Sequence, residues 1–188
     1  PVSTFPNNNT ANVYFTSTSP VNATVSQAIS IGSLNLKSEW TGNLSLGNSA
    51  FAITNDLVIS GGVLNGGTAT VDVGGNVSLT GGFFTASTNV LSVTGDFIDI
   101  AGVFDASGGG KLLMDGADVN LEAAFDLYDL EISSGAKVTN NGYVFVINDL
   151  IIDGLIYNAG YGVFSANQIT GSGGVETNLG GQEGAIGI

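Results

Sequence analysis

The chain is 188 residues long and carries 16 carboxylates but only three lysines, with no arginine, histidine or cysteine, so its formal net charge is −13. This balance excludes nucleic acid as a partner, because almost nothing can neutralise phosphates, and it excludes a histidine-based nucleophilic triad. The sequence contains no run of 18 apolar residues, so we expect no direct membrane insertion.

Residues 1–30 differ in composition from the rest of the chain, and we expect them to form an N-terminal arm or cap. The opening PVSTFPNNNT is rich in proline and asparagine and indicates a loop, and short alternating segments after it indicate two strands. Because a strand edge at the end of a stack is a template for pairing, the arm covers either its own chain or a neighbour. The side chains predicted to make such an assembly contact are Val13, Tyr14, Phe15 and Val25.

From residue 51 the chain contains three consecutive blocks of 20 residues that align without a gap, beginning at Phe51, Val71 and Leu91. In each block, apolar and polar residues alternate over short runs bounded by glycine, asparagine or aspartate. This pattern is typical of short strands joined by sharp corners. Similar alternating segments lie outside the blocks, at residues 34–36, 44–46, 130–132 and 150–152.

A repeat of this length predicts stacked units, because a single block cannot bury its apolar face alone. If one block is one coil, equivalent strands pair in parallel with those of the next coil. We therefore predict an all-β fold, a parallel β-helix (β-solenoid) over residues 31–175, with about 20 residues per turn and about seven to eight turns. Residues 176–188 are expected to form a Gly-rich C-terminal tail.

One apolar column of the repeat is interrupted, because Ile59 and Leu79 are followed by Asp99. A buried unpaired carboxylate is costly, so we expect a bulge that turns Ile98 and Ile100 into the core. The next coil is then expected at a spacing of 21 residues. That spacing aligns Leu112, Met114, Val119 and Leu121 with Leu91, Val93, Ile98 and Ile100.

The C-terminal end of the predicted stack contains no amphipathic helix that would cap it, so we expect its last coil to be an open docking face. Head-to-tail contacts that do not close generate filaments, and we therefore predict that the chain polymerises with itself. The side chains near this end that are predicted to contribute are Tyr157, Tyr161, Phe164 and Ile169.

No group of residues in the sequence indicates catalysis, so we expect no enzyme activity and no catalytic, cofactor-binding or metal-site residues. Carboxylates suited to glycoside hydrolysis occur in pairs at 96 and 99, 115 and 118, and 126 and 129, but no histidine or dense aromatic platform accompanies them. Calcium bound incidentally at corners such as Asp153 and Asn158 is the alternative to simple turns. Four Asn-X-Ser/Thr sequons are either glycosylated or unmodified, at Asn8, Asn22, Asn43 and Asn76.

The segments GNVSLTGGFFTA from Gly75 and GDFIDIAGVFDA from Gly95 resemble repeats of bacterial β-strand-repeat surface proteins, the adhesin- or autotransporter-passenger-like group. The resemblance covers roughly residues 30–155. It implies a right-handed β-helix on an exported protein. Such passengers are usually much longer, which favours a subunit that gains length by polymerising.

We therefore expect an exported structural protein, a subunit of a self-assembling surface filament or extracellular matrix fibre that stacks end to end. Its expected location is extracellular or at the cell surface, and its main partner is itself. The alternative is an adhesin-type module that recognises a glycan or another surface protein through the side wall of the solenoid. A carbohydrate-active enzyme is the remote alternative.

Overall fold

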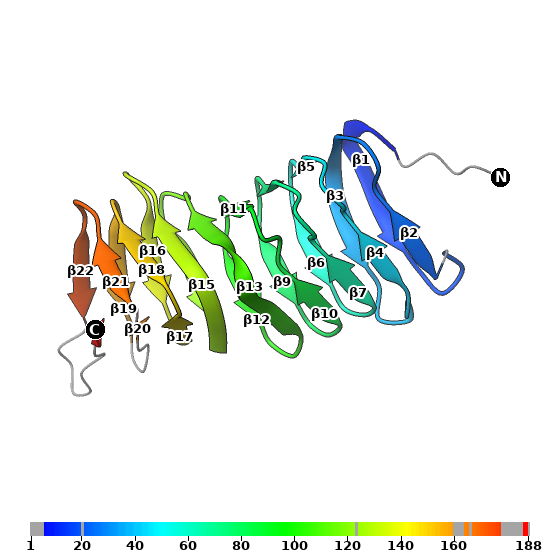
Figure 1. Cartoon of the computed structure of the whole chain (residues 1–188). Helices are drawn as coiled ribbons and strands as arrows, with labels where there is room; N and C mark the ends of the chain where they lie inside the picture. The colour runs from blue at the N-terminus through cyan, green and yellow to red at the C-terminus, as the bar shows by residue number, and fades with distance from the viewer. Residues whose placement is uncertain are drawn as a thin grey trace.

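The computed structural model describes residues 6–19, 21–122, 124–159, 164–165, 167–177 and 186–187. The strands pair in parallel and stack into a β-solenoid of about eight coils, with β1 at one end and β22 at the other (Figure 1). The predicted all-β parallel β-helix and its number of turns are confirmed. Within the described part of the chain, no helix is long and apolar enough to cross a membrane.

Each full coil contributes strands to three parallel ladders. The first ladder contains the first residues of β3 (Ile29–Leu36), then β5 (Phe51–Ile53), β8 (Val71–Val73), β11 (Val90–Val93), the end of β13 (Val103–Met114), the end of β15 (Ala124–Ile132), β18 (Asp149–Ile152) and β21 (Gln168–Thr170).

The second ladder begins with β1 and passes through the end of β3. It contains β1 (Asn8–Phe15), β6 (Leu57–Ile59), β9 (Val77–Leu79), β12 (Phe97–Asp99), β14 (Val119–Glu122), β16 (Lys137–Asn140), β19 (Leu155–Asn158) and β22 (Gly174–Thr177).

The third ladder includes the first parts of β13 and β15. It contains β2 (Asn22–Thr24), β4 (Asn43–Ser45), β7 (Val63–Asn65), β10 (Phe83–Thr85) and β17 (Tyr143–Val146). Two further short strands, β20 (Phe164–Ser165) and β23 (Ile186–Gly187), pair with each other, and β20 lies against β17.

The core is a set of apolar columns that run along the axis, because each inward residue packs on its equivalent in the next coil. Period-2 alternation turns every second residue of a strand inward, so the predicted block alignment is also the structural register. One such column on the first ladder is at most 4% exposed throughout and contains Ile29, Phe51, Val71, Leu91, Leu112, Leu130 and Leu150.

Glycines turn the corner between the second and third ladders. Gly62 and Gly82 have φ angles of +64° and +69°, a region that residues with a Cβ rarely adopt. A Cβ on Gly82 would also lie 2.8 Å from the backbone of Gly61. Trp40 is buried beside this corner, and its ring lies 4.7 Å from that of Phe15.

Asparagine and aspartate side chains join successive coils at the corner between the first and second ladders. The backbone N–H of Asn76 donates to Asp56 Oδ1 at 2.8 Å, and the N–H of Asp96 donates to Asn76 Oδ1 at 2.8 Å. Asp96 Oδ1 then accepts from the backbone N–H of Asn120 at 2.7 Å and from its Nδ2 at 3.1 Å. These residues form one chain of hydrogen bonds, which we call the corner ladder.

The bulge predicted at Asp99 is wrong. Asp99 pairs in register with Leu79 and is half-buried, and its Oδ1 accepts from the backbone N–H of Gly102 at 2.8 Å. Because this bond satisfies the carboxylate at the corner, no bulge is needed. Ile98 therefore faces outward and is half-buried, and Ile100 is 74% exposed.

The alignment of the next coil is correct on the first ladder and wrong on the second. Leu112 and Met114 pair with Leu91 and Val93 as predicted. On the second ladder, however, Leu121 pairs with Phe97. The spacing between paired residues rises from 21 on the first ladder to 24 on the second because residues 115–118, between β13 and β14, lengthen the corner.

Two asparagines occupy the core position of the second ladder that Leu121 fills in the coil before them. Leu121 pairs with Asn140, which pairs with Asn158, and both asparagines are at most 1% exposed. Asn140 Nδ2 donates to Asn158 Oδ1 at 2.9 Å and to the carbonyl of Gly142 at 3.2 Å, and the Gly142 N–H donates to Asn140 Oδ1 at 3.1 Å. The amide is accommodated because its polar atoms have partners.

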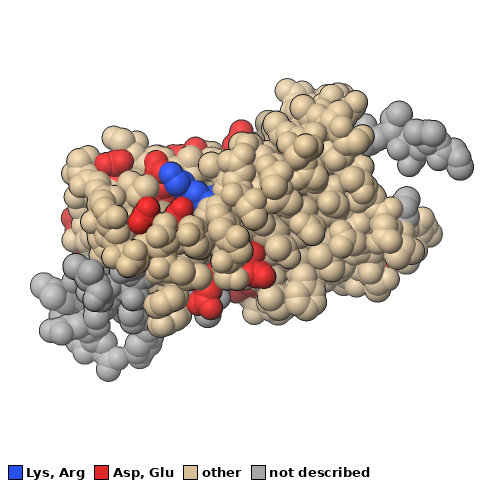
Figure 2. Space-filling model, viewed as in Figure 1, with Lys and Arg blue, Asp and Glu red and all other residues tan. Residues whose placement is uncertain are grey.

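Charge is distributed unevenly along the solenoid. Residues 1–95 contain three carboxylates and one lysine, a net charge of −2, whereas residues 96–188 contain thirteen carboxylates and two lysines, a net charge of −11. In Figure 2 the charged side chains accordingly gather over the C-terminal half, and the other half shows almost none on this face.

Candidate functional site

Large apolar side chains are exposed along the outer face of the third ladder. Phe83 and Val103 are 54% and 47% exposed and pair with each other, and Tyr143 is 48% exposed two strands further along the ladder. Phe145 and Ile147 are 37% and 38% exposed and follow Tyr143 at alternate positions, along β17 and just beyond it. We call these five residues the apolar stripe.

A groove of about 410 Å³ opens on the same face. Its walls come from β13, β15 and β17, and they are formed by Phe104, Asp105, Ser107, Asp126 and Tyr143. We call this the third-ladder groove. It crosses neighbouring strands because its residues lie about 20 positions apart in the sequence.

Two carboxylates of the groove are neighbours. Ala106 pairs with Leu127, so the residues before them, Asp105 and Asp126, lie on adjacent strands, about 4.8 Å apart in the ladder direction. Asp105 Oδ1 accepts from the Ser107 hydroxyl at 2.7 Å and from its backbone N–H at 3.1 Å. Both carboxylates are exposed and have lone pairs to offer to a ligand that donates hydrogen bonds.

The floor of the groove is aromatic. The Phe104 ring lies 5.2 Å from that of Phe84 and 4.8 Å from that of Phe97, which are both fully buried. Such tilted ring pairs are favourable. The groove therefore rests on a packed aromatic cluster of the core.

No cation lines the groove among the described residues. Lys111 Nζ lies 2.6 Å from Glu131, Lys137 Nζ lies 3.2 Å from Asp118, and Lys37 Nζ lies 5.2 Å from the centre of the Tyr14 ring. The groove is thus acidic without an ion pair of its own.

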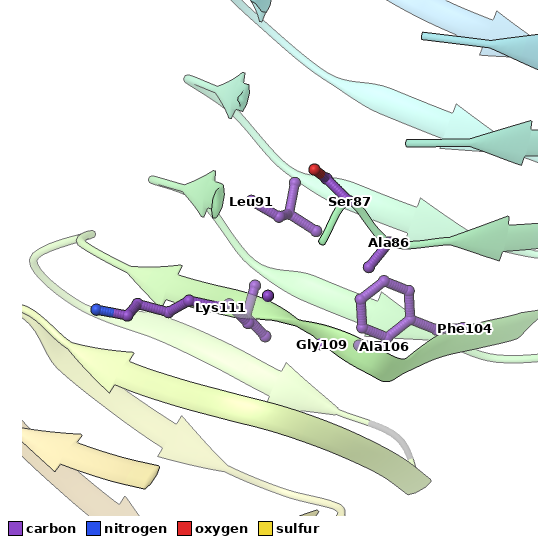
Figure 3. Close-up of a pocket in the computed structure, with 9 residues that line it drawn as sticks. Ala86, Ser87, Leu91, Phe104, Ala106, Gly109 and Lys111 are labelled. Carbon is purple, nitrogen blue, oxygen red and sulfur yellow. The ribbon is translucent and has the colours of Figure 1, made fainter. Parts of the chain in front are cut away.

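Another hollow is a seam between the third and first ladders (Figure 3). It lies between Ala86, Phe104 and Gly110 and has no room for a water molecule. The Ser87 hydroxyl beside it donates to the Ala69 carbonyl and accepts from the Asn89 N–H. This seam is packing space, and it offers no binding site.

The residues predicted for N-terminal assembly divide into buried and exposed sets. Phe15 and Val25 are 6% and 3% exposed and belong to the core of their own chain. Val13 packs partly against that core, and Tyr14 is 52% exposed. The predicted arm supplies the first coil, since β1 pairs with β3 and β2 pairs with β4.

Of the residues predicted for C-terminal assembly, Tyr157 lies in β19 and Ile169 in β21, at the opposite end of the solenoid from β1 and β2 (Figure 1). Tyr157 is half-buried on the outer side of the second ladder and pairs with Glu176, and Ile169 packs partly against the core. Tyr161 lies outside the described residues. Phe164 lies in β20, and its side chain is outside the described part.

The sequons all lie on strands or at corners. Asn8, Asn22 and Asn76 are exposed, and Asn43 is half-buried. The Oδ1 atom of Asn8 accepts from the backbone N–H and the hydroxyl of Thr10, at 3.1 Å and 2.9 Å.

The residues named for incidental calcium do not form a common site. Asp153 Oδ1 accepts from the N–H and hydroxyl of Ser172, whereas Asn158 is buried in the core and is no surface ligand. No cluster of three or more potential metal-binding side chains occurs among the residues that the structure describes.

The carboxylate pairs considered from the sequence are not those that share a groove. Asp126 lines the third-ladder groove, but Asp129 lies on the first ladder, where its Oδ1 accepts from Asn148 and Asp149. The pairing of Asp105 with Asp126 was missed because it depends on the register between coils. The 21-residue spacing between them was the available signal.

Comparison of the chain with protein-family models, with curated proteins and with solved structures found no match. A function for the chain therefore has to be inferred from its fold and its groove.

Proposed function

We propose that this chain is an exported structural subunit that stacks end to end into a surface filament or matrix fibre. The observation that supports this proposal is that, among the described residues, the outermost strands at both ends have a ladder partner on one side only. β1 pairs with β3 and β2 with β4, while β21 pairs with β18 and β22 with β19. Strand edges of this kind are templates for pairing with another chain.

The core also supports this arrangement. At the C-terminal end, Val175 is 40% exposed and Ile169 is only partly covered. At the N-terminal end, Val13 and Tyr14 lie on the strand that a stacked neighbour would extend. A joint between β22 of one subunit and β1 of the next would lengthen the second ladder and bury Val175.

The charge distribution favours one polarity of stacking. A head-to-tail joint places the acidic C-terminal half of one subunit against the nearly neutral N-terminal half of the next. A tail-to-tail joint brings two acidic halves together, which costs electrostatic free energy. Head-to-tail stacking is also the geometry that grows without closing.

Size measurement and negative-stain microscopy of the full chain test this proposal. Filaments that lengthen with protein concentration are the expected result. Val175→Lys places a charge in the joint and is expected to abolish them, while Ile100→Lys, on the side wall at an even more exposed residue, leaves them intact. A chain that stays monomeric at high concentration contradicts the proposal.

The second candidate, an adhesin-type binding module, is favoured by the apolar stripe. Exposed aromatic residues on one outer face are unusual for a solvated wall and typical of interaction surfaces. The two functions are compatible, because the stripe lies on the side wall and the joints lie at the ends.

A further inference from the structure

We propose that the third-ladder groove binds a neutral polysaccharide chain. A sugar ring presents apolar C–H faces and a rim of hydroxyl groups. In the groove, the half-exposed Tyr143 ring offers an apolar face, and Asp105, Asp126 and Ser107 offer hydrogen-bond acceptors beside it. Sites that combine an apolar surface with a few convergent polar groups are typical of ligand recognition.

The arrangement along the axis favours an extended chain over a single sugar. Parallel register repeats each outward position from coil to coil, so the ring of Phe83 and the ring of Tyr143 lie on one line parallel to the solenoid axis. Asp105, Asp126 and Phe145 lie on the neighbouring line. A polymer of repeated sugars meets a repeated set of contacts on this face.

Charge selects the class of polysaccharide. The groove belongs to the half of the chain that carries a net charge of −11, and no lysine among the described residues lines it. An anionic polymer is repelled there, since its charges have no counterion in the groove. A neutral polymer meets no such repulsion, and its hydroxyl groups can donate charge-assisted hydrogen bonds to the carboxylates.

The same residues argue against a protein partner, including a second copy of this chain. The buried centre of a protein interface is depleted in charged side chains, whereas Asp105 and Asp126 lie in the middle of this face. Two copies joined through the stripe would place these carboxylates against each other. Asp105 is already oriented by Ser107, which suits an acceptor for hydroxyl groups.

Affinity electrophoresis of the full chain tests this inference. Native gels contain galactomannan, xyloglucan or hydroxyethyl cellulose as neutral polymers, alginate as the anionic polymer and polylysine as the cationic one. Retardation by at least one neutral polymer, and none by alginate, is the expected result. Tyr143→Ala, Asp105→Ala and Asp126→Ala each weaken that retardation, with an apparent dissociation constant raised about tenfold, the effect of one lost contact of ordinary strength.

Matched controls keep the outcome separate from folding and from assembly. Asp72→Ala, on an exposed carboxylate of the first ladder, and Tyr14→Ala, on an exposed ring of the second ladder, keep the retardation of the wild-type chain. Circular dichroism and thermal melting of every variant report folding. Val175→Lys, which blocks the proposed joint, still binds, so a loss of polysaccharide binding is distinguishable from a loss of filament formation.

Three results overturn the inference. The first is no retardation by any neutral polymer, and the second is retardation that the groove variants leave unchanged. The third is retardation by polylysine alone, which identifies the face as a site for cationic chains.

Discussion

At the scale of single residues, the glycines between the second and third ladders are under a strict steric constraint. Gly82 combines a φ of +69° with backbone atoms of the previous coil 2.8 Å from where a Cβ would lie. A Cβ in this position strains the backbone and cannot be relieved by moving a flexible side chain. Glycine recurs at this corner of successive coils because consecutive coils approach each other so closely there.

Replacing Gly82 by alanine is expected to lower the free energy of unfolding by about 1–3 kcal/mol, the usual cost of a strained backbone position. Thermal melting or urea unfolding of the full chain measures it. Gly108→Ala is the matched control, because a Cβ there meets nothing within 4 Å, and it is expected to leave stability nearly unchanged. Equal effects of the two substitutions contradict this account.

At the scale of elements, the corner ladder shows how polar side chains hold coils in register. Asp56, Asn76 and Asp96 each accept a backbone N–H from the following coil. Corner backbone groups that the strand ladders do not pair need such partners. Because the acceptor is a side-chain oxygen, aspartate and asparagine serve equally well, which explains why both occur in the corner ladder.

Asp96→Ala removes the acceptor of two bonds from Asn120 and is expected to lower the free energy of unfolding by about 1–3 kcal/mol. Asp96→Asn retains an oxygen acceptor and is expected to remain close to the wild type. Urea unfolding of the three proteins measures the difference. If Asp96→Asn is as unstable as Asp96→Ala, the charge of Asp96 rather than its hydrogen bonds stabilises the corner ladder.

At the scale of the whole molecule, the uneven charge is the dominant feature. Thirteen carboxylates and two lysines share the C-terminal half, so this half repels itself and repels any like copy beside it. The N-terminal half has almost no such field. The ends of the solenoid are therefore chemically different even though both present parallel strand edges.

Raising the NaCl concentration is expected to increase the thermal midpoint and to accelerate end-to-end assembly. Salt screens repulsion between exposed charges, and the screening length is only about 10 Å at 0.1 M. Melting curves and light scattering between about 0.01 M and about 0.5 M NaCl measure both effects. A midpoint and an assembly rate that do not change with salt would show that repulsion between the carboxylates neither lowers stability nor slows assembly.

Much of the fold was predictable from the sequence because its signals are local. Alternation over three residues decides which side chains turn inward, as in Phe51–Ile53, and glycine or aspartate decides where the chain bends. The stack repeats these choices every 20 residues, so the alignment of Phe51, Val71 and Leu91 is also their pairing in space.

The bulge at Asp99 was a wrong prediction because the sequence does not show what satisfies a polar group. The Gly102 N–H that donates to this carboxylate is identified only when the corner is folded. The buried pair Asn140 and Asn158 has the same explanation. Each residue alone resembles a corner asparagine, and only the register places one upon the other in the core.

The sequence by itself determined the class of fold, the number of residues in a coil and the uneven distribution of charge along the chain. These properties depend on local pattern and on composition. Only the tertiary structure decided that Asp105, Asp126 and Tyr143 share a groove and that Phe15 and Val25 cover their own core. The physical reason is that contacts between coils depend on the summed lengths of the corners. Corners of different length change the sequence spacing of paired residues, which is 18 for Leu112 and Leu130 and 24 for Phe97 and Leu121.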